Sequence, residues 1–284
     1  MQISLLQCQS SHDVSENLKY IDSQLHLLPR DPAEPQLVVL PECCLLFGGH
    51  ESQQLEYAGD PSLGIRPLEK TMSELAVKYD IYLVAGTIPV RTGGERVYSR
   101  TYLFDNKGDI LGDYDKLHLF DVDVADGTKE YRESDTFCAG ERISVIDTPF
   151  GKLGLAICYD LRFPDFFRAM RLAGAELIAL PAAFTKVTGA AHWQPLIQAR
   201  AIETQCFILA AAQWGKHNQG SRETWGQSMI VDPWGRIEAQ KMDGCGWVQA
   251  KLDKTEQLKI RQEIPVLKHN RFSAPSLQHK DARG

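Results

Sequence analysis

The chain has 284 residues, of which 43% are hydrophobic and 24% charged, values that are ordinary for a soluble globular protein. Its 31 basic and 37 acidic residues give a net charge of -6, which argues against the broad basic surface of a nucleic-acid-binding protein. Membrane and secreted proteins are also disfavoured. No apolar run approaches the roughly 18 residues that span a bilayer, and residues 1–9 lack the basic region and apolar core of a signal peptide.

Apolar periodicity divides the first half of the chain into strands and helices. Alternating or continuous apolar runs predict strands at residues 3–8, 37–40, 81–86, 98–104 and 109–114. Apolar residues three or four positions apart predict helices over residues 14–28 and 68–79. Residues 116–141 show no periodicity and many charges, which indicates a long surface loop. Loops of that length in compact domains are commonly functional, and this one is a candidate for closing on substrate over residues 117–140.

The second half continues the alternation. It predicts strands at residues 143–148, 152–157, 176–180, 206–212, 224–231, 236–240 and 247–252, and helices starting at Pro164 and covering 190–204 and 254–263. We therefore expect an α/β fold in which helices cover mixed sheets, because several of the strands are joined as hairpins. Residues 1–265 form one predicted domain, and the basic, irregular tail over residues 266–284 is a candidate contact to a partner subunit.

Seven cysteines are scattered along the chain rather than grouped. No Cys-x-x-Cys pair occurs, so the spacing of a zinc site is absent. An odd number of cysteines in a chain of this length is also untypical of a disulfide-stabilised secreted domain. We expect a cytoplasmic protein with reduced cysteines, with neither metal nor organic cofactor, and with no nucleic-acid or membrane partner.

Three chemically active side chains follow predicted strands. Glu42 comes after the strand at 37–40, Lys116 after the strand at 109–114, and Cys158 directly after the strand at 152–157. Ligands of α/β proteins bind in the crevice outside the carboxyl ends of strands. If the fold brings the three together, they form a candidate catalytic set.

A carboxylate and an ammonium beside a thiol would suit nucleophilic catalysis. The thiolate is the nucleophile and an ordinary thiol is mostly protonated at neutral pH, so Glu42 would accept the proton of Cys158 and later activate water. Lys116 and the backbone N–H of Tyr159 would stabilise the oxyanion. Taken singly, each side chain has an ordinary structural interpretation: a packed cysteine, a turn glutamate and a surface lysine.

The surroundings of these residues resemble a known family. Leu40-Pro41-Glu42, the block from Tyr114 to Phe120 and the block from Gly154 to Pro164 resemble, in order, the three signature blocks of the nitrilase or carbon–nitrogen hydrolase superfamily. The resemblance covers nearly the whole chain. It implies a four-layer α-β-β-α sandwich and a homodimer.

The same resemblance implies a role for each residue. Glu42 is implied as general base, Lys116 as proton donor and oxyanion stabiliser, and Cys158 as nucleophile. Glu133 resembles a further glutamate of many members, which would hold Lys116 or the substrate amide. Its alternative is a solvated loop residue.

Residues 188–193, 199–206 and 210–217 resemble the amidases of the Nit branch, and the last two stretches are more similar to amidases of deaminated glutathione than to ω-amidases. This implies hydrolysis of deaminated glutathione to 2-oxoglutarate and cysteinylglycine, a metabolite-repair reaction. Ala190 departs from the proline of many members. The alternatives are an ω-amidase acting on 2-oxoglutaramate or another small monoamide, and a non-catalytic metabolite-binding or scaffold protein.

A small anionic amide needs a partner for its carboxylates, and arginine binds these well. Arg162, near the nucleophile, is the first candidate, with an internal ion pair as the alternative. Phe184 and Thr185 follow a predicted strand and are expected to line the pocket. His118 and His192 offer a cysteine–histidine dyad as an alternative, but the resemblance assigns the base to glutamate.

Overall fold

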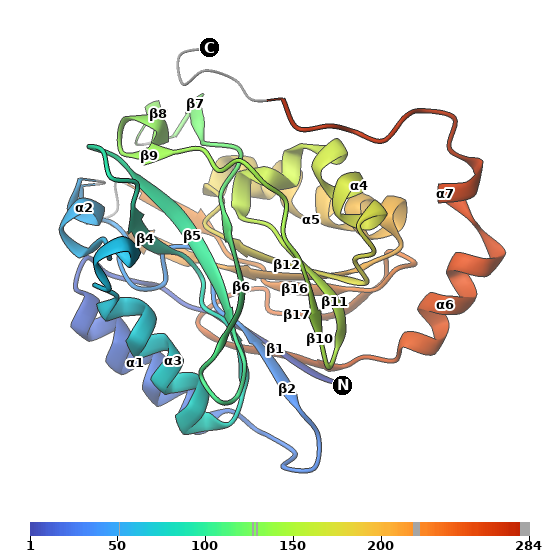
Figure 1. Cartoon of the computed structure of the whole chain (residues 1–284), viewed down its shortest axis with the longest axis horizontal. Helices are drawn as coiled ribbons and strands as arrows, with labels where there is room; N and C mark the ends of the chain where they lie inside the picture. The colour runs from blue at the N-terminus through green and yellow to red at the C-terminus, as the bar shows by residue number, and fades with distance from the viewer. Residues whose placement is uncertain (51, 127, 129, 218–221, 279–284) are drawn as a thin grey trace.

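Two mixed β-sheets lie face to face in the computed structural model, which describes residues 1–50, 52–126, 128, 130–217 and 222–278 (Figure 1). The first sheet has the strand order β18-β1-β2-β3-β5-β4, and β6 and β9 also pair with β5. Its strands are β1 (Gln2–Gln7), β2 (Gln36–Val39), β3 (Tyr82–Val84), β4 (Ile88–Arg91), β5 (Val97–Phe104), β6 (Ile110–Asp115), β9 (Phe137–Cys138) and β18 (Gly246–Lys251). The central strands β1, β2 and β3 are parallel, so their carboxyl ends meet at one edge.

The second sheet has the order β10-β11-β12-β13-β16-β17. Its strands are β10 (Val145–Thr148), β11 (Gly151–Leu155), β12 (Leu177–Ala182), β13 (Phe207–Ala212), β16 (Met229–Val231) and β17 (Ile237–Gln240). Here β11, β12 and β13 are parallel, and antiparallel strands flank them. Each sheet therefore has a parallel centre, from which polar residues can extend at the strand ends.

Helices cover the outer face of each sheet, on opposite sides of the molecule (Figure 1). Helices α1 (Val14–Leu27) and α3 (Pro67–Tyr79) pack on the first sheet, and α4 (Pro164–Leu172) and α5 (Lys186–Thr204) pack on the second. The sequence at β2 is continuously apolar because both faces of the strand are buried. Leu37 and Val39 face the core between the sheets, whereas Val38 and Leu40 face α1 and α3. The predicted four-layer α-β-β-α sandwich is confirmed.

Smaller elements lie around this sandwich. They are α2 (Gln53–Tyr57), the 3-10 turns η1 (Pro61–Leu63), η2 (Glu133–Asp135) and η3 (Cys158–Arg162), the hairpins β7 (Asp121–Asp123) with β8 (Glu130–Arg132) and β14 (Trp214–His217) with β15 (Arg222–Trp225), and the helices α6 (Lys254–Glu263) and α7 (Val266–His269). None of the described helices is long and apolar enough to cross a membrane.

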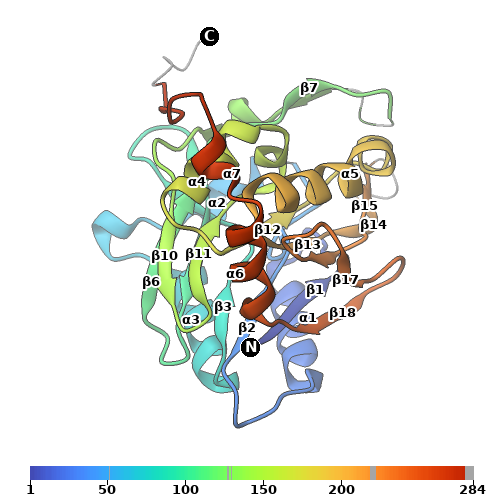
Figure 2. The ribbon, with the colours of Figure 1, turned by 90° about the vertical axis from the view of Figure 1, so that its right-hand side faces the viewer.

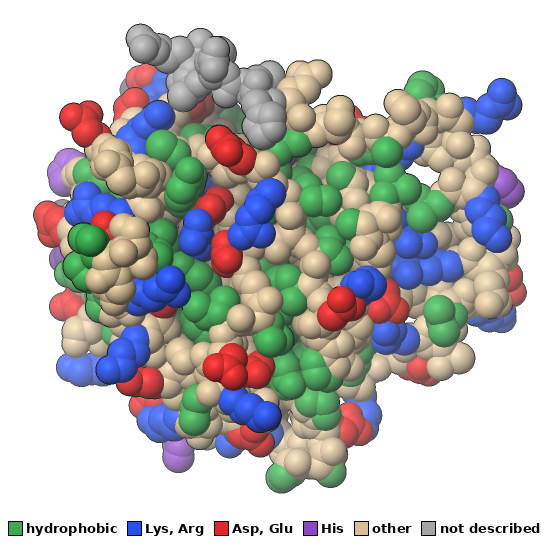
Figure 3. All heavy atoms as spheres, viewed as in Figure 1, with side chains coloured by type: hydrophobic (Ala, Val, Ile, Leu, Met, Phe, Trp, Pro, Cys, Tyr) green, Lys and Arg blue, Asp and Glu red, His purple; other side chains and the backbone are tan. Residues whose placement is uncertain are grey.

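The C-terminal arm formed by α6, α7 and the residues up to 278 lies along one side of the sandwich (Figure 2), and basic side chains gather between it and the body (Figure 3). Helix α7 lies in a segment that we expected to be irregular. Arg168 of α4 ties the arm down by donating to the Phe272 carbonyl at 2.8 Å, while the Phe272 ring is 82% exposed. Residues 279–284 of the predicted tail lie outside the described residues.

Three sequence predictions need correction. The segment at 116–141 is not simply a surface loop, because it contains β7, β8, η2 and β9, and the side chains of Lys116 and Glu133 are buried in it. The strand expected at 224–231 is two strands, separated at Gly226 and Gln227, which both have positive φ. Strands β4 and β14 were not predicted, since each has only four residues and forms one side of a short antiparallel hairpin.

Helix α5 also begins earlier than expected. Its first turn, Lys-Val-Thr-Gly, has low helix propensity. The Thr185 side chain nevertheless caps the turn by accepting from the Thr188 N–H, and a Cβ on Gly189 would lie 2.2 Å from the Trp225 Cβ. Capping and close tertiary packing therefore outweigh local propensity here.

Candidate active site

Glu42 lies in a tight turn after β2 that neighbouring residues hold in place. The next residue, Cys43, has φ +54° and donates its N–H to Thr87 Oγ1 at 2.8 Å. Gly86 has φ +62°, and a Cβ there would lie 2.3 Å from the Pro41 carbonyl oxygen, so only glycine fits against the turn. On the other side, buried Gln213 donates to the Glu42 carbonyl oxygen at 3.0 Å. These contacts from both sheets fix the direction of the Glu42 side chain.

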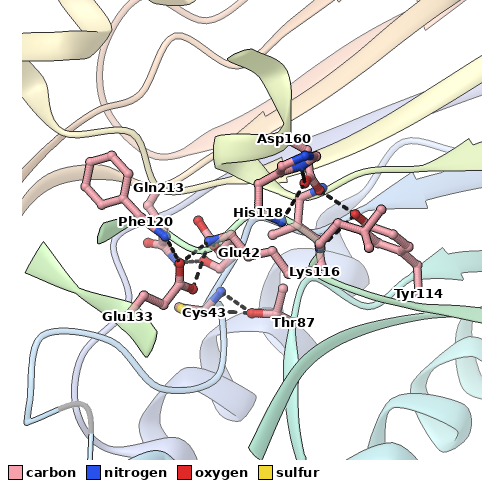
Figure 4. A network of polar contacts seen from close by, with 12 residues as sticks. Glu42, Cys43, Thr87, Tyr114, Lys116, His118, Phe120, Glu133, Asp160 and Gln213 are labelled. Atoms are coloured by element: carbon pink, nitrogen blue, oxygen red, sulfur yellow. Dashed lines mark hydrogen bonds and ion pairs between the residues drawn. The ribbon is translucent and has the colours of Figure 1, made fainter. Parts of the chain in front are cut away.

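Lys116 follows β6 and reaches the Glu42 carboxylate (Figure 4). Its Nζ lies 2.8 Å from Glu42 Oε1, and 2.8 and 2.9 Å from the two oxygens of Glu133. The Phe120 N–H donates to Glu133 Oε2 at 2.6 Å. The Lys116 side chain is 2% exposed and those of Glu42 and Glu133 are 6% and 12% exposed, so the three form a buried ionic cluster.

Burial and charge act in opposite directions on this cluster. Burial lowers the pKa of Lys116, but the two carboxylates outweigh burial and hold that pKa well above its usual value. For Glu133, burial raises the pKa, the Lys116 charge lowers it, and the Glu42 charge raises it, with a net rise. Lys116 is therefore a permanent cation in the site.

Cys158 begins the turn η3 directly beyond β11, with φ +45°. This left-handed conformation is costly for a non-glycine residue and needs support from its surroundings. The fully buried Asp160 carboxylate supplies it by accepting from the Ile157 N–H at 2.8 Å, the Tyr114 hydroxyl at 2.8 Å and the His118 N–H at 3.2 Å (Figure 4). The turn that carries the thiol is thus tied to the segment that carries Lys116.

The Cys158 thiol is buried and protonated at rest. Burial raises its pKa well above the usual value, the Glu42 charge raises it further, and the Lys116 charge opposes the rise. The thiol and the Glu42 side chain line the same cavity. A base beside a thiol of raised pKa can remove its proton during attack rather than before it.

The predicted residues Glu42, Lys116, Glu133, Cys158, Tyr159, Phe184 and Thr185 all line one cavity. Sequence reasoning missed Arg222, which also lines it, and Gln213, which holds Glu42 from behind. Neither stands out in the sequence, because each reaches the site only through long-range packing. Within the described part of the chain, no group of three or more His, Cys, Asp or Glu side chains could hold a metal ion.

Arg162 and the two candidate histidines are not among the residues that line the cavity. Arg162 lies next to it, with its guanidinium carbon 5.2 Å from the centre of the Phe184 ring and its Nη1 3.2 Å from His192 Nδ1. His118 Nδ1 lies 2.7 Å from Asp160 Oδ1, and its ring stacks on Phe163. Neither histidine lines the cavity, so the geometry gives no support to a cysteine–histidine dyad.

The profile of the carbon–nitrogen hydrolase family matches residues 2–257. The chain belongs to this family. It is therefore a hydrolase of carbon–nitrogen bonds. A relative from Yersinia enterocolitica, named deaminated glutathione amidase, is 44% identical over 272 residues that cover 95% of this chain and 93% of the relative.

Two solved structures extend the comparison. Saccharomyces cerevisiae Nit3, described as a member of branch 10 of the nitrilase superfamily, is 31% identical with a TM-score of 0.85, covering 96% of this chain and 97% of Nit3. A glutamate-to-glutamine mutant of an amidase from Nesterenkonia is 25% identical with a TM-score of 0.75, covering 93% of this chain and 98% of that one. That structure is described as showing acrylamide added to the active-site cysteine.

Proposed function

We propose that the chain is an amidase that hydrolyses deaminated glutathione to 2-oxoglutarate and cysteinylglycine, with Cys158 as nucleophile. The observation that carries the reaction type is the buried cluster in which Lys116 contacts both Glu42 and Glu133, in the cavity that Cys158 also lines. The Yersinia relative supports the choice of substrate. The adduct described for the Nesterenkonia amidase supports a nucleophilic cysteine.

In the first half of the reaction, Glu42 accepts the thiol proton as Cys158 Sγ attacks the amide carbon. The electron pair of the carbonyl moves to oxygen, and Lys116 Nζ and the Tyr159 N–H stabilise the oxyanion. Collapse of this intermediate breaks the C–N bond. Glu42 returns the proton to the leaving nitrogen, cysteinylglycine departs, and a 2-oxoglutaryl thioester remains on Cys158.

In the second half, a water molecule takes the place of the departed amine. Glu42 removes a proton from this water as its oxygen attacks the thioester carbon, and the same donors stabilise the second oxyanion. Collapse breaks the C–S bond, Glu42 passes the proton to the sulfur, and 2-oxoglutarate leaves. Glu133 positions Lys116 throughout, because its two oxygens accept from Nζ at 2.8 and 2.9 Å.

We further propose that the enzyme is a homodimer that works in metabolite repair in the cytoplasm. The exposed Phe272 ring and the 44% exposed Leu277 on the C-terminal arm support an intersubunit contact. The seven free cysteines suit a reducing compartment. Light scattering on the full chain, compared with a chain ending at residue 265, tests the dimer: a monomeric full chain would refute it.

The test of the reaction is steady-state hydrolysis of deaminated glutathione and 2-oxoglutaramate by the wild type, by Cys158→Ala, and by Cys245→Ala as a control at an exposed thiol. We expect a preference for deaminated glutathione that only Cys158→Ala abolishes. A preference for 2-oxoglutaramate would make the protein an ω-amidase by the same mechanism. Hydrolysis of neither substrate would refute the proposed function.

A further inference from the structure

The cavity is electrostatically unsuited to an anionic substrate at its catalytic end. Glu42 and Glu133 contribute two carboxylates there, and Lys116 contributes one ammonium that already contacts both. When all three are ionised the cluster carries one excess negative charge. Deaminated glutathione carries two carboxylates of its own, so its binding needs another cation on the cavity wall.

Arg222 supplies a permanent positive charge on that wall. It begins β15, in the hairpin with β14 that lies beside α5 (Figure 2). Its guanidinium carbon lies 4.4 Å from the centre of the Phe47 ring and 5.2 Å from the centre of the Tyr131 ring. Both rings also line the cavity. The guanidinium is thus held by aromatic residues from two other segments, the loop after β2 and strand β8.

The two rings are themselves fixed. Phe47 packs edge-on against the His217 ring with centroids 4.4 Å apart, and the Tyr131 hydroxyl donates to Asp126 Oδ2 at 2.9 Å. A guanidinium packed against aromatic faces keeps the N–H donors in its own plane oriented, and this planar fork matches the two oxygens of a carboxylate.

The charge of Arg222 extends towards the catalytic residues. Burial and the Glu42 charge raise the pKa of the Cys43 thiol to about 12, and the positive charge of Arg222 opposes this rise. Because Cys43 directly follows Glu42 and lines the cavity, Arg222 faces the same space as the catalytic cluster.

We propose that Arg222 binds a carboxylate of the substrate and so makes the enzyme selective for anionic amides. The inference rests on the proposed function for the identity of the substrate. The carboxylate has two possible sources, the 2-oxo acid end of the acyl group and the glycine end of the leaving group. Binding the first would also hold the thioester during its hydrolysis.

Kinetics of Arg222→Met and Arg222→Lys test this role, with Arg236→Met as the control because Arg236, at the β16–β17 turn, is half exposed and pairs with the exposed Glu256. The substrates are deaminated glutathione, its glycinamide analogue and 2-oxoglutaramate. We expect Arg222→Met to lower kcat/KM for deaminated glutathione by roughly 10- to 100-fold, the loss of a charge-assisted hydrogen-bonded pair. Arg222→Lys should lose less, because it keeps the charge without the fork.

The three substrates distinguish the two carboxylates. An equal loss on all three assigns Arg222 to the 2-oxo acid end. A loss on deaminated glutathione alone, with the glycinamide analogue already poor in the wild type, assigns it to the glycine end. Either result supports the proposal, whereas values of kcat/KM within twofold of wild type on every substrate overturn it.

A binding measurement separates this inference from the proposed function. Calorimetry of deaminated glutathione with Cys158→Ala, and with Cys158→Ala combined with Arg222→Met, needs no turnover. A Kd weakened by roughly 10- to 100-fold in the double variant supports the role of Arg222 even if the wild type fails to hydrolyse this compound. An unchanged Kd, or no binding to Cys158→Ala, overturns it. Thermal melting of each variant, together with the Arg222→Lys variant, shows whether a weaker Kd arises from a folding defect.

Discussion

Replacement of Lys116 by methionine should be the most destabilising neutral substitution in the site. Methionine keeps the length of the side chain, but it leaves Glu42 and Glu133 without the ammonium that lies 2.8 Å from each. All three side chains are at least 88% buried, since the most exposed of them is 12% exposed. Removing one partner of a buried ion pair costs about 3–5 kcal/mol. We expect the free energy of unfolding to fall by at least this amount, because the substitution leaves two buried carboxylates without a cationic partner.

The loss should depend on pH in a defined direction. Burial already raises the pKa of Glu133 and the Lys116 charge is the main opposing influence, so removing Lys116 raises that pKa further. A carboxyl group whose folded-state pKa is raised binds its proton more tightly when folded. The destabilisation is therefore complete above the folded-state pKa, shrinks as the pH falls, and vanishes below the unfolded-state value of about 4.3.

Urea denaturation at about pH 8 and about pH 5 measures both effects through the change in unfolding free energy. Lys78→Met is the matched control, because Lys78 lies 2.6 Å from Asp22 with the two side chains 55% and 40% exposed. Exposed pairs contribute little, so the control should stay close to wild type at both pH values. If the two variants lose similar stability, or if the loss for Lys116→Met grows as the pH falls, the reasoning is wrong.

Three further substitutions probe the parts that position the site. Glu42→Gln should lower kcat/KM by about 10²–10⁴-fold through loss of the proposed general base. Because burial and the Glu42 charge together raise the pKa of the Cys158 thiol, Glu42→Gln should also move its alkylation by iodoacetamide to lower pH. Asp160→Asn places an amide donor against the N–H and O–H groups that donate to the carboxylate. It should lower the free energy of unfolding, measured by urea denaturation, by about 1–3 kcal/mol, and it should also lower kcat. Gly86→Ala should lower kcat/KM about 10²-fold by displacing the Glu42 turn, measured at saturating and limiting substrate.

The substitutions of Asp160 and Gly86 each have a matched control. Asp147→Asn changes an exposed aspartate paired with Lys152 and should leave stability and kcat unchanged. Gly93→Ala adds the same methyl group at a positive φ of 85° with no atom within 4 Å, so it carries the backbone strain without the collision. Equal effects of the two glycine substitutions would refute the packing argument. An alkylation profile of Cys158 that stays in place in Glu42→Gln would refute the electrostatic one.

The layers of the fold could be predicted because they follow from local periodicity. The 3.6-residue stripe of α1 and the continuous apolar run of β2 each report the surroundings of their own segment. The burial of the segment around Glu133 could not be predicted, since it arises from contacts with Lys116 and Phe120 and not from any apolar periodicity. The charges there resemble those of a solvated loop until the cluster is assembled.

The arginine chosen from the sequence as a carboxylate partner shows the same limit of local patterns. Arg162 is close to Cys158 in sequence, and its guanidinium lies over the Phe184 ring and beside His192, but Arg162 itself is not among the residues that line the cavity. Arg222 is distant in sequence and reaches the cavity through the β14–β15 hairpin, whose first strand has no strong local pattern. Proximity along the chain thus singled out Arg162 and gave no sign that Arg222 lines the cavity.

The site takes its groups from both halves of the sandwich. The segments that carry Glu42 and Lys116 follow strands of the first sheet, and Cys158 follows a strand of the second. During synthesis, a nascent chain that has emerged only as far as β10 holds the carboxylate and the ammonium but not the thiol. The last strand of the first sheet, β18, is also made after every strand of the second. The proposed catalytic set is therefore complete only when both sheets have formed, which would make enzymatic activity a readout of complete folding.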